Sequence, residues 1–190
     1  MQLPMERIQS PAIPSNSAVS DMQPSDFAEV LSLNNLNIAA VGELTKPKLK
    51  FLFNNCETAL VAHDDDQLIA FAFAFREGST YNSPNYAYFV ERHAQFLYVD
   101  RIVVAKECQG QGVGSKIYKR LLKGPLVCLE VNAANPRSRE FHINKGFAIV
   151  ERVKREGYSV DFMVRGGKAI ANPKPAQESR APKYEKQEQK

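Results

Sequence analysis

Residues 96–116 read FLYVDRIVVAKECQGQGVGSK, and the architecture of the chain follows from this stretch. An apolar, β-branched run typical of a buried strand leads into a turn with three glycines, and the turn opens an expected helix. Glycines let a backbone approach a bound group closely, and such a turn presents free N–H groups beside the positive end of the helix dipole. The stretch therefore predicts a site for phosphate or pyrophosphate.

Three phosphate-binding patterns compete for this turn. The P-loop pattern GxxxxGK[ST] does not fit, because the residue after Gly114 is Ser115 rather than lysine. The dinucleotide pattern GxGxxG is nearly met by Gly110, Gly112 and Ser115, and Glu130 lies at about the spacing of the ribose-binding acid. A dinucleotide fold normally opens with this pattern and continues with several βα units, whereas here the turn lies past the middle of the chain. A nicotinamide-dependent oxidoreductase is therefore an alternative, and the position of the turn argues against it.

The third pattern, Q/R-x-x-G-x-G/A, is matched in order by Gln109, Gly112 and Gly114. A second segment, 129–147, contains LEVN, then an asparagine, then Phe-His, and ends in Gly-Phe. With both motifs in this order, the sequence resembles the GNAT superfamily of acetyl-CoA-dependent N-acetyltransferases. The resemblance covers most of residues 25–165.

The resemblance implies an α/β GNAT fold, in which a central mixed sheet of six to seven strands is splayed at the cofactor site and flanked by about four helices. The residues themselves predict an α/β order as well, because runs of period two alternate with runs of helical period. We expect strands at 27–33, 57–62, 67–75, 96–104, 126–131, 147–154 and 158–164, and helices at 38–53 (two pieces), 86–92, 113–123 and 135–145.

Composition predicts one domain between two tails. Residues 1–24 are rich in proline and serine, residues 167–190 in proline, lysine and glutamine, and both are expected to be disordered. The acetyltransferase domain would then span residues 25–166. Most of the net charge of +4 lies in 167–190, so the charge does not predict a nucleic-acid partner.

Other features predict mainly what the chain lacks. Three cysteines without a CxxC spacing predict neither a disulfide framework nor a zinc site, and we expect no metal. No apolar run is long enough to cross a bilayer, and the first 24 residues lack the apolar core of a signal peptide. We therefore expect a cytoplasmic protein, monomeric or homodimeric, that binds neither nucleic acid nor membrane.

The resemblance implies how CoA is held. Backbone amides of the turn would grip the pyrophosphate, and the preceding strand would pair its backbone with the pantetheine arm and polarise the acetyl carbonyl with one N–H. An asparagine would contact the pantetheine or cap the helix beside it. The residues implied are Ile102, Val103 and Val104 on the strand, Gln109, Gly110, Gln111, Gly112, Val113, Gly114 and Ser115 in the turn, and Asn135.

Five basic residues surround the turn and admit two interpretations. One or two of them could neutralise the 3′-phosphate of CoA, or all could form a solvated helix face. They are Lys106, Lys116, Lys119, Arg120 and Lys123.

Acetyl transfer to an amine needs a base for the ammonium and an acid for the leaving thiolate. His142 stands where the family commonly has a tyrosine, and it could be the acid or could pack beside the cofactor. Asp100 is the candidate base, with Tyr98 on the same strand face by period two. Alternatively, Asp100 forms an ion pair with Arg101 or Arg139.

The loop at 77–95 would lie near the acceptor in this topology. Its aromatic and amide side chains suit an amine-bearing molecule, although several could instead pack the loop onto the sheet. The candidates for acceptor binding are Tyr81, Asn82 and Tyr86.

The expected activity is direct transfer of an acetyl group from acetyl-CoA to a primary amine, of a small molecule or of a peptide or protein. Two alternatives belong to other classes. One is a non-catalytic acyl-CoA-binding sensor or regulatory module. The other is a hydrolase that uses Cys108 and His142, which would leave the glycine turn unexplained.

Overall fold

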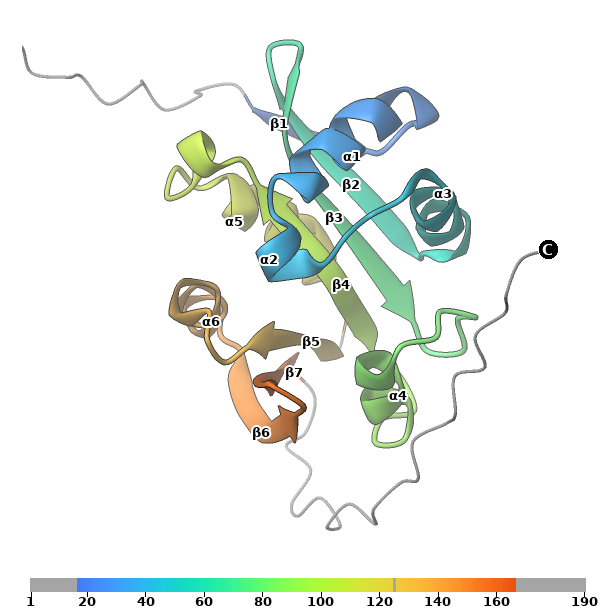
Figure 1. Cartoon of the computed structure of the whole chain (residues 1–190), viewed down its shortest axis with the longest axis vertical. Coiled ribbons are helices and arrows are strands. Elements are labelled where there is room, and N and C mark those ends of the chain that lie inside the picture. The colour runs from blue at the N-terminus through green and yellow to red at the C-terminus, as the bar shows by residue number, and fades with distance from the viewer. Residues whose placement is uncertain (1–16, 125, 167–190) are drawn as a thin grey trace, which may run out of the picture.

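A seven-stranded mixed sheet forms the centre of the molecule in the computed structural model, which describes residues 17–124 and 126–166 (Figure 1). The strand order is β1-β2-β3-β4-β5-β7-β6, and all neighbours are antiparallel except β4 and β5. The strands are β1 (Ala18–Asp21), β2 (Thr58–Asp64), β3 (Gln67–Arg76), β4 (Leu97–Val104), β5 (Leu126–Asn132), β6 (Ala148–Arg155) and β7 (Tyr158–Gly166).

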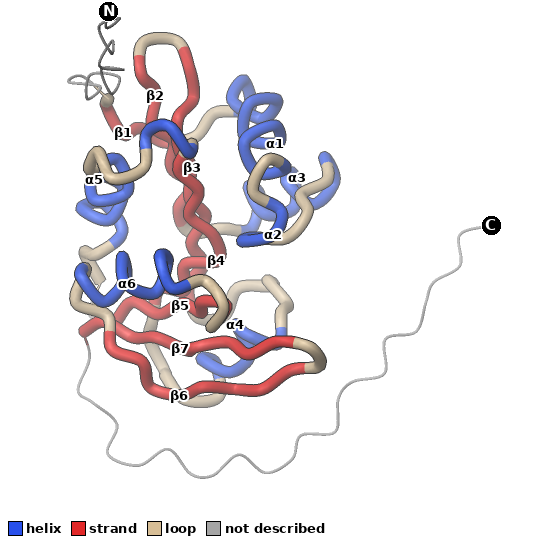
Figure 2. The backbone as a smooth tube through the Cα atoms, turned by 60° about the vertical axis from the view of Figure 1, so that its left-hand side comes forward, coloured by secondary structure: helices blue, strands red, loops and turns tan. Residues whose placement is uncertain are grey.

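Helices cover both faces of the sheet. Figure 2 shows α1 and α3 on one side of the β1–β4 part and α5 on the other. None of the helices in the described ranges is long and apolar enough to span a bilayer. The helices are α1 (Phe27–Asn35), α2 (Ile38–Val41), α3 (Lys46–Asn55), α4 (Pro84–Val90), α5 (Val113–Leu121) and α6 (Pro136–Asn144), with short 3-10 turns at Pro24–Asp26 and Lys106–Cys108.

The predicted α/β class and the mixed sheet are confirmed, with six helices rather than about four. The strand predicted at 27–33 is wrong, because these residues form α1. Val30, Leu33 and Asn34 are its buried residues, a helical spacing that a partial alternation in so short a run concealed. The sheet still has seven strands because another strand precedes this helix.

That strand, β1, lies inside the stretch predicted as the tail 1–24. It has four residues and is mostly exposed, so it carries almost no apolar signal in the sequence. Its backbone pairs with β2 from Ala18 opposite His63 to Asp21 opposite Leu60. The rest of the predicted tails, 1–16 and 167–190, lies outside the described residues.

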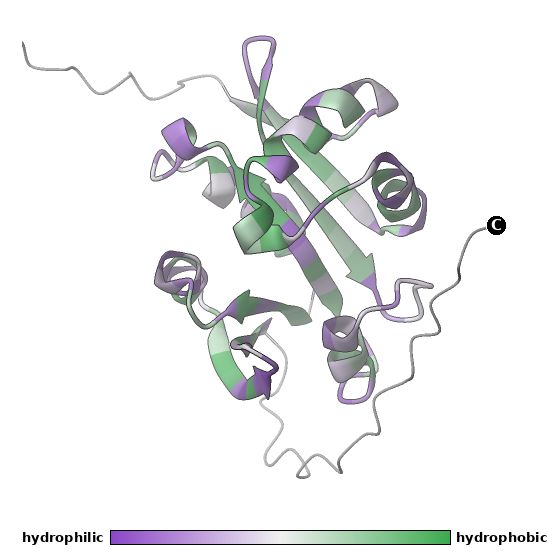
Figure 3. Cartoon of the chain, in the orientation of Figure 1, coloured by the Kyte–Doolittle hydropathy of each residue, from purple (hydrophilic) through white to green (hydrophobic). Residues whose placement is uncertain are grey.

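The core is built on β3, in which Phe71, Phe73 and Phe75 alternate with alanines and all are buried. Because side chains alternate across a strand, the rings project from one face and the methyl groups from the other. β3 is hydrophobic along nearly its whole length (Figure 3). Helices on both faces of such a strand explain why its sequence is a continuous apolar run.

The sheet opens between β4 and β5. These two strands pair only at Leu97–Val127 and Tyr98–Cys128, and each continues beyond that point without the other. Opposite β3, the register of β4 shifts, so that Asp100 is an extra residue with no partner. A bulge of this kind bends the strand and redirects its side chains. The splay that the resemblance implied is therefore present.

Candidate active site

A cavity of about 960 Å³ lies at the splay between β4 and β5. Its lining residues form two groups. The turn side consists of the glycine turn, the start of α5, and α6. The α2 side consists of α2 and its flanks, Lys48, and the loop around Tyr81–Asn85. Tyr158 and Val160 of β7 also line the cavity. The facing parts of β4 and β5 join the two sides.

The glycine turn has the geometry of an anion cradle. Gly110 and Gly112 both adopt φ +83°, in the left-handed region that favours glycine. A Cβ atom on Gly112 would meet nothing within 4 Å, so this position faces open space. Gly112 is also the N-cap of α5 and provides no side-chain cap, which leaves the first N–H groups of the helix available. Backbone donors beside open space are what a pyrophosphate needs.

Nearly all predicted CoA residues line the cavity. Gln111 is the exception, because its amide nitrogen donates to the carbonyl of Glu107 at 2.8 Å. Gln109 has a second task, since its amide nitrogen donates to the carbonyl of Val104 at 2.9 Å and ties the turn to the end of β4. Those that line it are Ile102, Val103, Val104, Gln109, Gly110, Gly112, Val113, Gly114, Ser115 and Asn135.

Asn135 and Gly114 also fix α6 in place. The side-chain oxygen of Asn135 accepts from the backbone N–H of Ser138 at 3.0 Å and caps the helix. A Cβ on Gly114 would lie 2.9 Å from the ring of Phe141, so glycine allows α5 and α6 to approach closely. The glycine turn thus contributes to packing as well as to the cavity.

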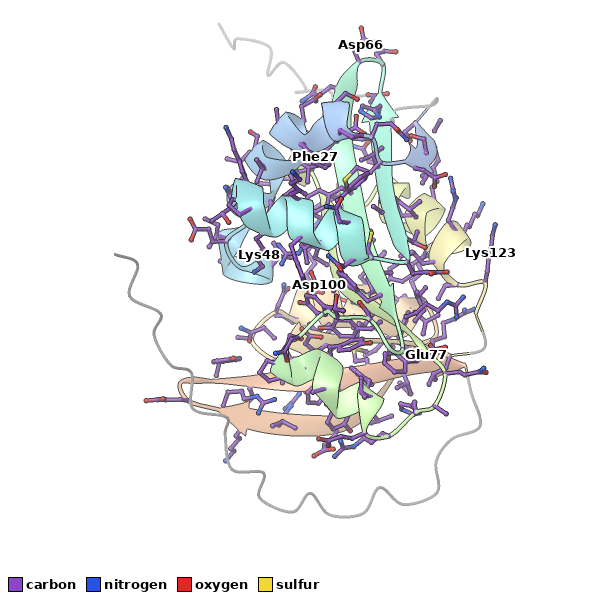
Figure 4. The ribbon with its side chains drawn as sticks, turned by 90° about the vertical axis from the view of Figure 1, so that its right-hand side faces the viewer. Phe27, Lys48, Asp66, Glu77, Asp100 and Lys123 are labelled. Carbon is purple, nitrogen blue, oxygen red and sulfur yellow. The ribbon has the colours of Figure 1, made fainter. Side chains whose placement is uncertain are left out.

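The basic residues predicted around the turn do not line the cavity. The ammonium group of Lys116 donates to the carbonyl and hydroxyl of Ser17 at 3.1 and 2.9 Å. Arg120 is bonded to Asp21 at 2.6 Å, and Lys123 projects at the edge of the molecule (Figure 4). Lys116 and Arg120 therefore anchor β1, and their predicted role in phosphate binding is not supported. The cations that line the turn side are Arg137 of α6 and Lys145, which directly follows this helix.

Glu130 of β5 is the residue that the sequence did not single out for catalysis. Its carboxylate is partly buried in the cavity wall and accepts from the hydroxyl of Tyr98 at 2.8 Å and the amide of Asn85 at 2.9 Å. Loss of water around the carboxyl raises its pKa from 4.5 to about 7, and the charge of Asp100 adds to this, although both hydrogen bonds oppose it. The feature of the sequence that points to Glu130 is that it is the single acidic residue in the apolar run LVCLEV, residues 126–131.

Asp100 forms an ion pair with Arg101, which was the alternative to a role as the base. Its carboxylate accepts from Nε of Arg101 at 2.7 Å and from the hydroxyl of Tyr81, so both oxygens are occupied. The side chains of Asp100 and Arg101 are 6% and 4% exposed, and Asp100 lies in the middle of the molecule (Figure 4). Arg139 instead lies 3.6 Å from Asp161. Two neighbouring side chains can meet here because the bulge at Asp100 interrupts the alternation of β4.

Of the three predicted acceptor residues, Tyr81 alone lines the cavity. Its ring stacks on Phe75 with 4.2 Å between centroids. Tyr86 is buried and donates to the carbonyl of Arg76 at 2.6 Å, so it fixes the loop instead. Asn82 is exposed outside the cavity, and the amide that faces it belongs to Asn85.

His142 lines the cavity but is held as a neutral ring. Its Nδ1 donates to the carbonyl of Ser138 at 2.7 Å, and its Nε2 accepts from the hydroxyl of Tyr118 at 2.8 Å. Burial lowers its pKa to about 4. At neutral pH this imidazole has no proton to give from Nε2, which favours the packing alternative. The same bonds leave it without a link to Cys108, whose thiol pKa is raised by burial, so the hydrolase alternative has no support.

We expect His142→Ala to destabilise the protein by about 2–4 kcal/mol, because it leaves a cavity and an unpaired buried hydroxyl on Tyr118. Urea unfolding at pH 7 measures this loss. Stability of the unmutated chain should also fall as the pH drops from 6.5 towards 4, since the unfolded histidine binds a proton that the folded one refuses. An unchanged unfolding midpoint in the variant would contradict the packing role.

Comparisons with known proteins agree with this geometry. The sequence model of the acetyltransferase (GNAT) domain matches residues 55–149, half of the chain. A comparison with curated protein sequences found no match. Among solved structures, an N-acetyltransferase from Staphylococcus aureus Mu50 is similar, with 19% identity, a TM-score of 0.61, and coverage of 80% of this chain and 99% of that chain.

Two structures from Arabidopsis thaliana are also similar, each covering 80% of this chain and 99% of their own. NAA60 in complex with acetyl-CoA has 14% identity and a TM-score of 0.64. Naa50 in complex with the bisubstrate analogue CoA-Ac-MVNAL has 13% identity and a TM-score of 0.62. At such low identities these structures show only that the fold is similar. The evidence for the family is the match to the GNAT domain model. The chain belongs to the GNAT acetyltransferase family.

Proposed function

We propose that this acetyltransferase transfers the acetyl group of acetyl-CoA directly to a primary amine. The observation that carries the proposal is that the glycine cradle and the carboxyl of Glu130 line one cavity at the splay between β4 and β5. A cradle for pyrophosphate and a base of pKa about 7 in one cavity suit a reaction between a CoA thioester and an ammonium group.

The chain's own residues fit CoA. The amides from Gly110 to Ser115 bind the pyrophosphate, and Arg137 and Lys145 supply positive charge for the phosphates. Beyond Tyr98, the edge of β4 that faces β5 has no strand partner in the described chain, so its backbone is available to the pantetheine arm. A backbone N–H on this edge stabilises the oxygen of the carbonyl under attack.

Glu130 acts as the general base. It takes one proton from the ammonium and passes it to solvent. The freed amine then forms a C–N bond with the acetyl carbonyl carbon while the C–S bond breaks, the electron pair leaves with sulfur, and a second proton from nitrogen ends on sulfur. Tyr98 and Asn85 fix the direction of the Glu130 carboxylate. Asp100 acts on Glu130 through its charge and is not itself the base.

Calorimetric titration with acetyl-CoA, followed by release of free thiol with a panel of primary amines, tests the proposal. We expect saturable binding and amine-dependent thiol release. Binding without turnover across the panel would indicate the sensor alternative. Absence of binding at millimolar acetyl-CoA would contradict the proposal itself.

Substitutions at Asp100 and Arg101 should move the pKa of Glu130 in opposite directions. Asp100→Asn removes a nearby negative charge, so the pKa of Glu130 should fall. Arg101→Met removes the cation that balances Asp100, so the pKa of Glu130 should rise. Titration of the Glu130 carboxyl by carbon-13 NMR, assigned with Glu130→Gln, measures both.

Arg101→Lys keeps the positive charge and is the matched control, with a pKa of Glu130 close to that of the unmutated chain. Shifts of equal sign in the two charge-removing variants would show that they act through general disruption. They would then rule out charge coupling between Asp100 and Glu130.

A further inference from the structure

We infer that the acceptor is a small primary monoamine on an apolar body, such as an arylalkylamine, rather than a polyamine or an aminosugar. The inference rests on the proposed function, since it names the acceptor class of the same cavity. Two features carry it: an exposed apolar helix turn in the cavity wall, and charges that accommodate one ammonium group only.

The apolar turn is α2, whose sequence is Ile-Ala-Ala-Val. None of its four residues is buried, yet all four line the cavity. Ile38 is 47% exposed, and Leu36 just before it is 82% exposed. Contiguous exposed apolar residues beside a cavity are characteristic of a surface that a ligand covers.

Hydrogen bonds hold α2 in this position. The amide of Asn34 donates to the carbonyl of Gly42 at 3.0 Å, and that of Asn37 to the carbonyl of Leu33 at 2.8 Å. The side-chain oxygen of Asn34 in turn accepts from the guanidinium of Arg101 on β4 at 2.8 Å, in a buried contact. Both ends of α2 are thus fixed to α1, and α1 to β4. The segment therefore presents its apolar side chains to the cavity instead of collapsing onto the core.

A second apolar surface comes from β7. Tyr158, which is 52% exposed, and Val160 line the same cavity. Figures 1 and 2 place the β6–β7 hairpin apart from α2, with β5 between them. An apolar body whose amine reaches Glu130 on β5 has α2 and these two β7 residues available as contacts, because all of them line the same cavity as Glu130.

The charges near α2 suit one ammonium group. Three carboxylates line the cavity, and one of them, Glu140, lies on α6, on the turn side. Of the two on β4 and β5, Asp100 has both oxygens occupied by Arg101 and Tyr81, which leaves Glu130 for the amine. Lys48 lines the α2 side, and Arg155 lies 3.4 Å from the side-chain oxygen of Asn85. A second ammonium group on this side would meet these cations without a free carboxylate.

Three hydroxyl and amide side chains near Glu130 are similarly engaged. Tyr81 and Tyr98 donate their protons to carboxylates, and both ends of the Asn85 amide have partners. A sugar with several hydroxyl groups would lose its hydrogen bonds to water and find few replacements. An apolar body has no such loss and gains from contact with α2 and Tyr158.

Calorimetric binding to the full chain, with and without CoA, tests the inference. The probes are 2-phenylethylamine, 1,4-diaminobutane, glucosamine and a peptide with an N-terminal leucine. We expect 2-phenylethylamine to bind at least about 10-fold tighter than each of the others. Equal or tighter binding of the diamine or the aminosugar overturns the inference, and tighter binding of the peptide shows a protein acceptor instead.

A matched pair of variants locates the binding. Ile38→Asn should weaken 2-phenylethylamine at least about 10-fold, because it places an uncharged polar group where the apolar body lies. Phe51→Asn is the control and should bind like the unmutated chain, since Phe51 is similarly exposed, at 42%, but lies on α3 outside the cavity. No loss in Ile38→Asn, or equal losses in both, would overturn the inference.

The inference and the proposed function can fail separately. Thiol release that is fastest with the diamine or the aminosugar would leave the acetyltransferase proposal intact and overturn the acceptor class. Selective binding of 2-phenylethylamine that depends on Ile38, without thiol release, would support the acceptor class and contradict the catalytic proposal.

Discussion

Gly112→Glu is expected to lower the affinity for acetyl-CoA by at least about 100-fold, which is about 2.7 kcal/mol of binding free energy. A side chain at this position points into open space of the cavity, where the pyrophosphate is to bind. The carboxylate would occupy that space and repel the phosphates. Calorimetric titration of the variant with acetyl-CoA measures the loss.

Two controls separate occupation of the site from backbone strain. Gly112→Ala has the same unfavourable left-handed φ without the charge, and it should retain much of the affinity. Gly78→Glu introduces the same side chain at φ +77°, also with nothing within 4 Å, but outside the cavity. It should bind acetyl-CoA normally. Normal affinity in Gly112→Glu would refute the assignment of the turn.

Glu130→Gln is expected to lower kcat by about 10²- to 10⁴-fold, the range for removal of a general base. The substitution keeps the size of the side chain and an oxygen acceptor for Tyr98 or Asn85. The affinity for acetyl-CoA should therefore remain close to that of the unmutated chain. Steady-state rates of thiol release measure the effect, and unchanged turnover would remove Glu130 from the mechanism.

The pH dependence gives Glu130 a second signature. A base must be deprotonated to act, so kcat/KM should rise with pH up to about 7 and then level. The folded carboxyl binds a proton more tightly than the unfolded one, so this group makes the protein less stable as the pH rises from about 4.5 to about 7. Glu130→Gln should remove this trend, so that between pH 4.5 and pH 8 the variant gains about 3 kcal/mol of stability relative to the unmutated chain. Urea unfolding at pH 4.5 and pH 8 measures it.

The sequence predicted local structure correctly where residues close together in the chain determine it. The glycine turn needs left-handed backbone at Gly110 and Gly112, and Asn135 followed by proline begins α6 with its own cap. These signals depend on residues within one or two turns of chain. They sufficed to predict the cradle and the helix after it, with boundaries within about two residues.

Secondary structure was predicted wrongly or missed where contacts with residues distant in the sequence determine it. β1 has almost no apolar pattern and exists because β2 offers a free edge and Lys116 and Arg120 reach back to it across about a hundred residues. The predicted strand at 27–33 became α1 because its apolar residues suit either period over so short a run. In both places tertiary contacts outweighed local preference.

The stretch 96–116 made the glycine turn proposed to bind the cofactor predictable from residues close together in the chain, because backbone conformation and glycine placement are local properties. The arrangement of the acids proposed for catalysis depended on the folded structure. A bulge at Asp100 turned this carboxylate onto Arg101, and Tyr98 and Asn85 converged on Glu130 from separate elements. Which of the two acids is free to act as a base follows from burial and pairing, and these arise only when distant segments pack together.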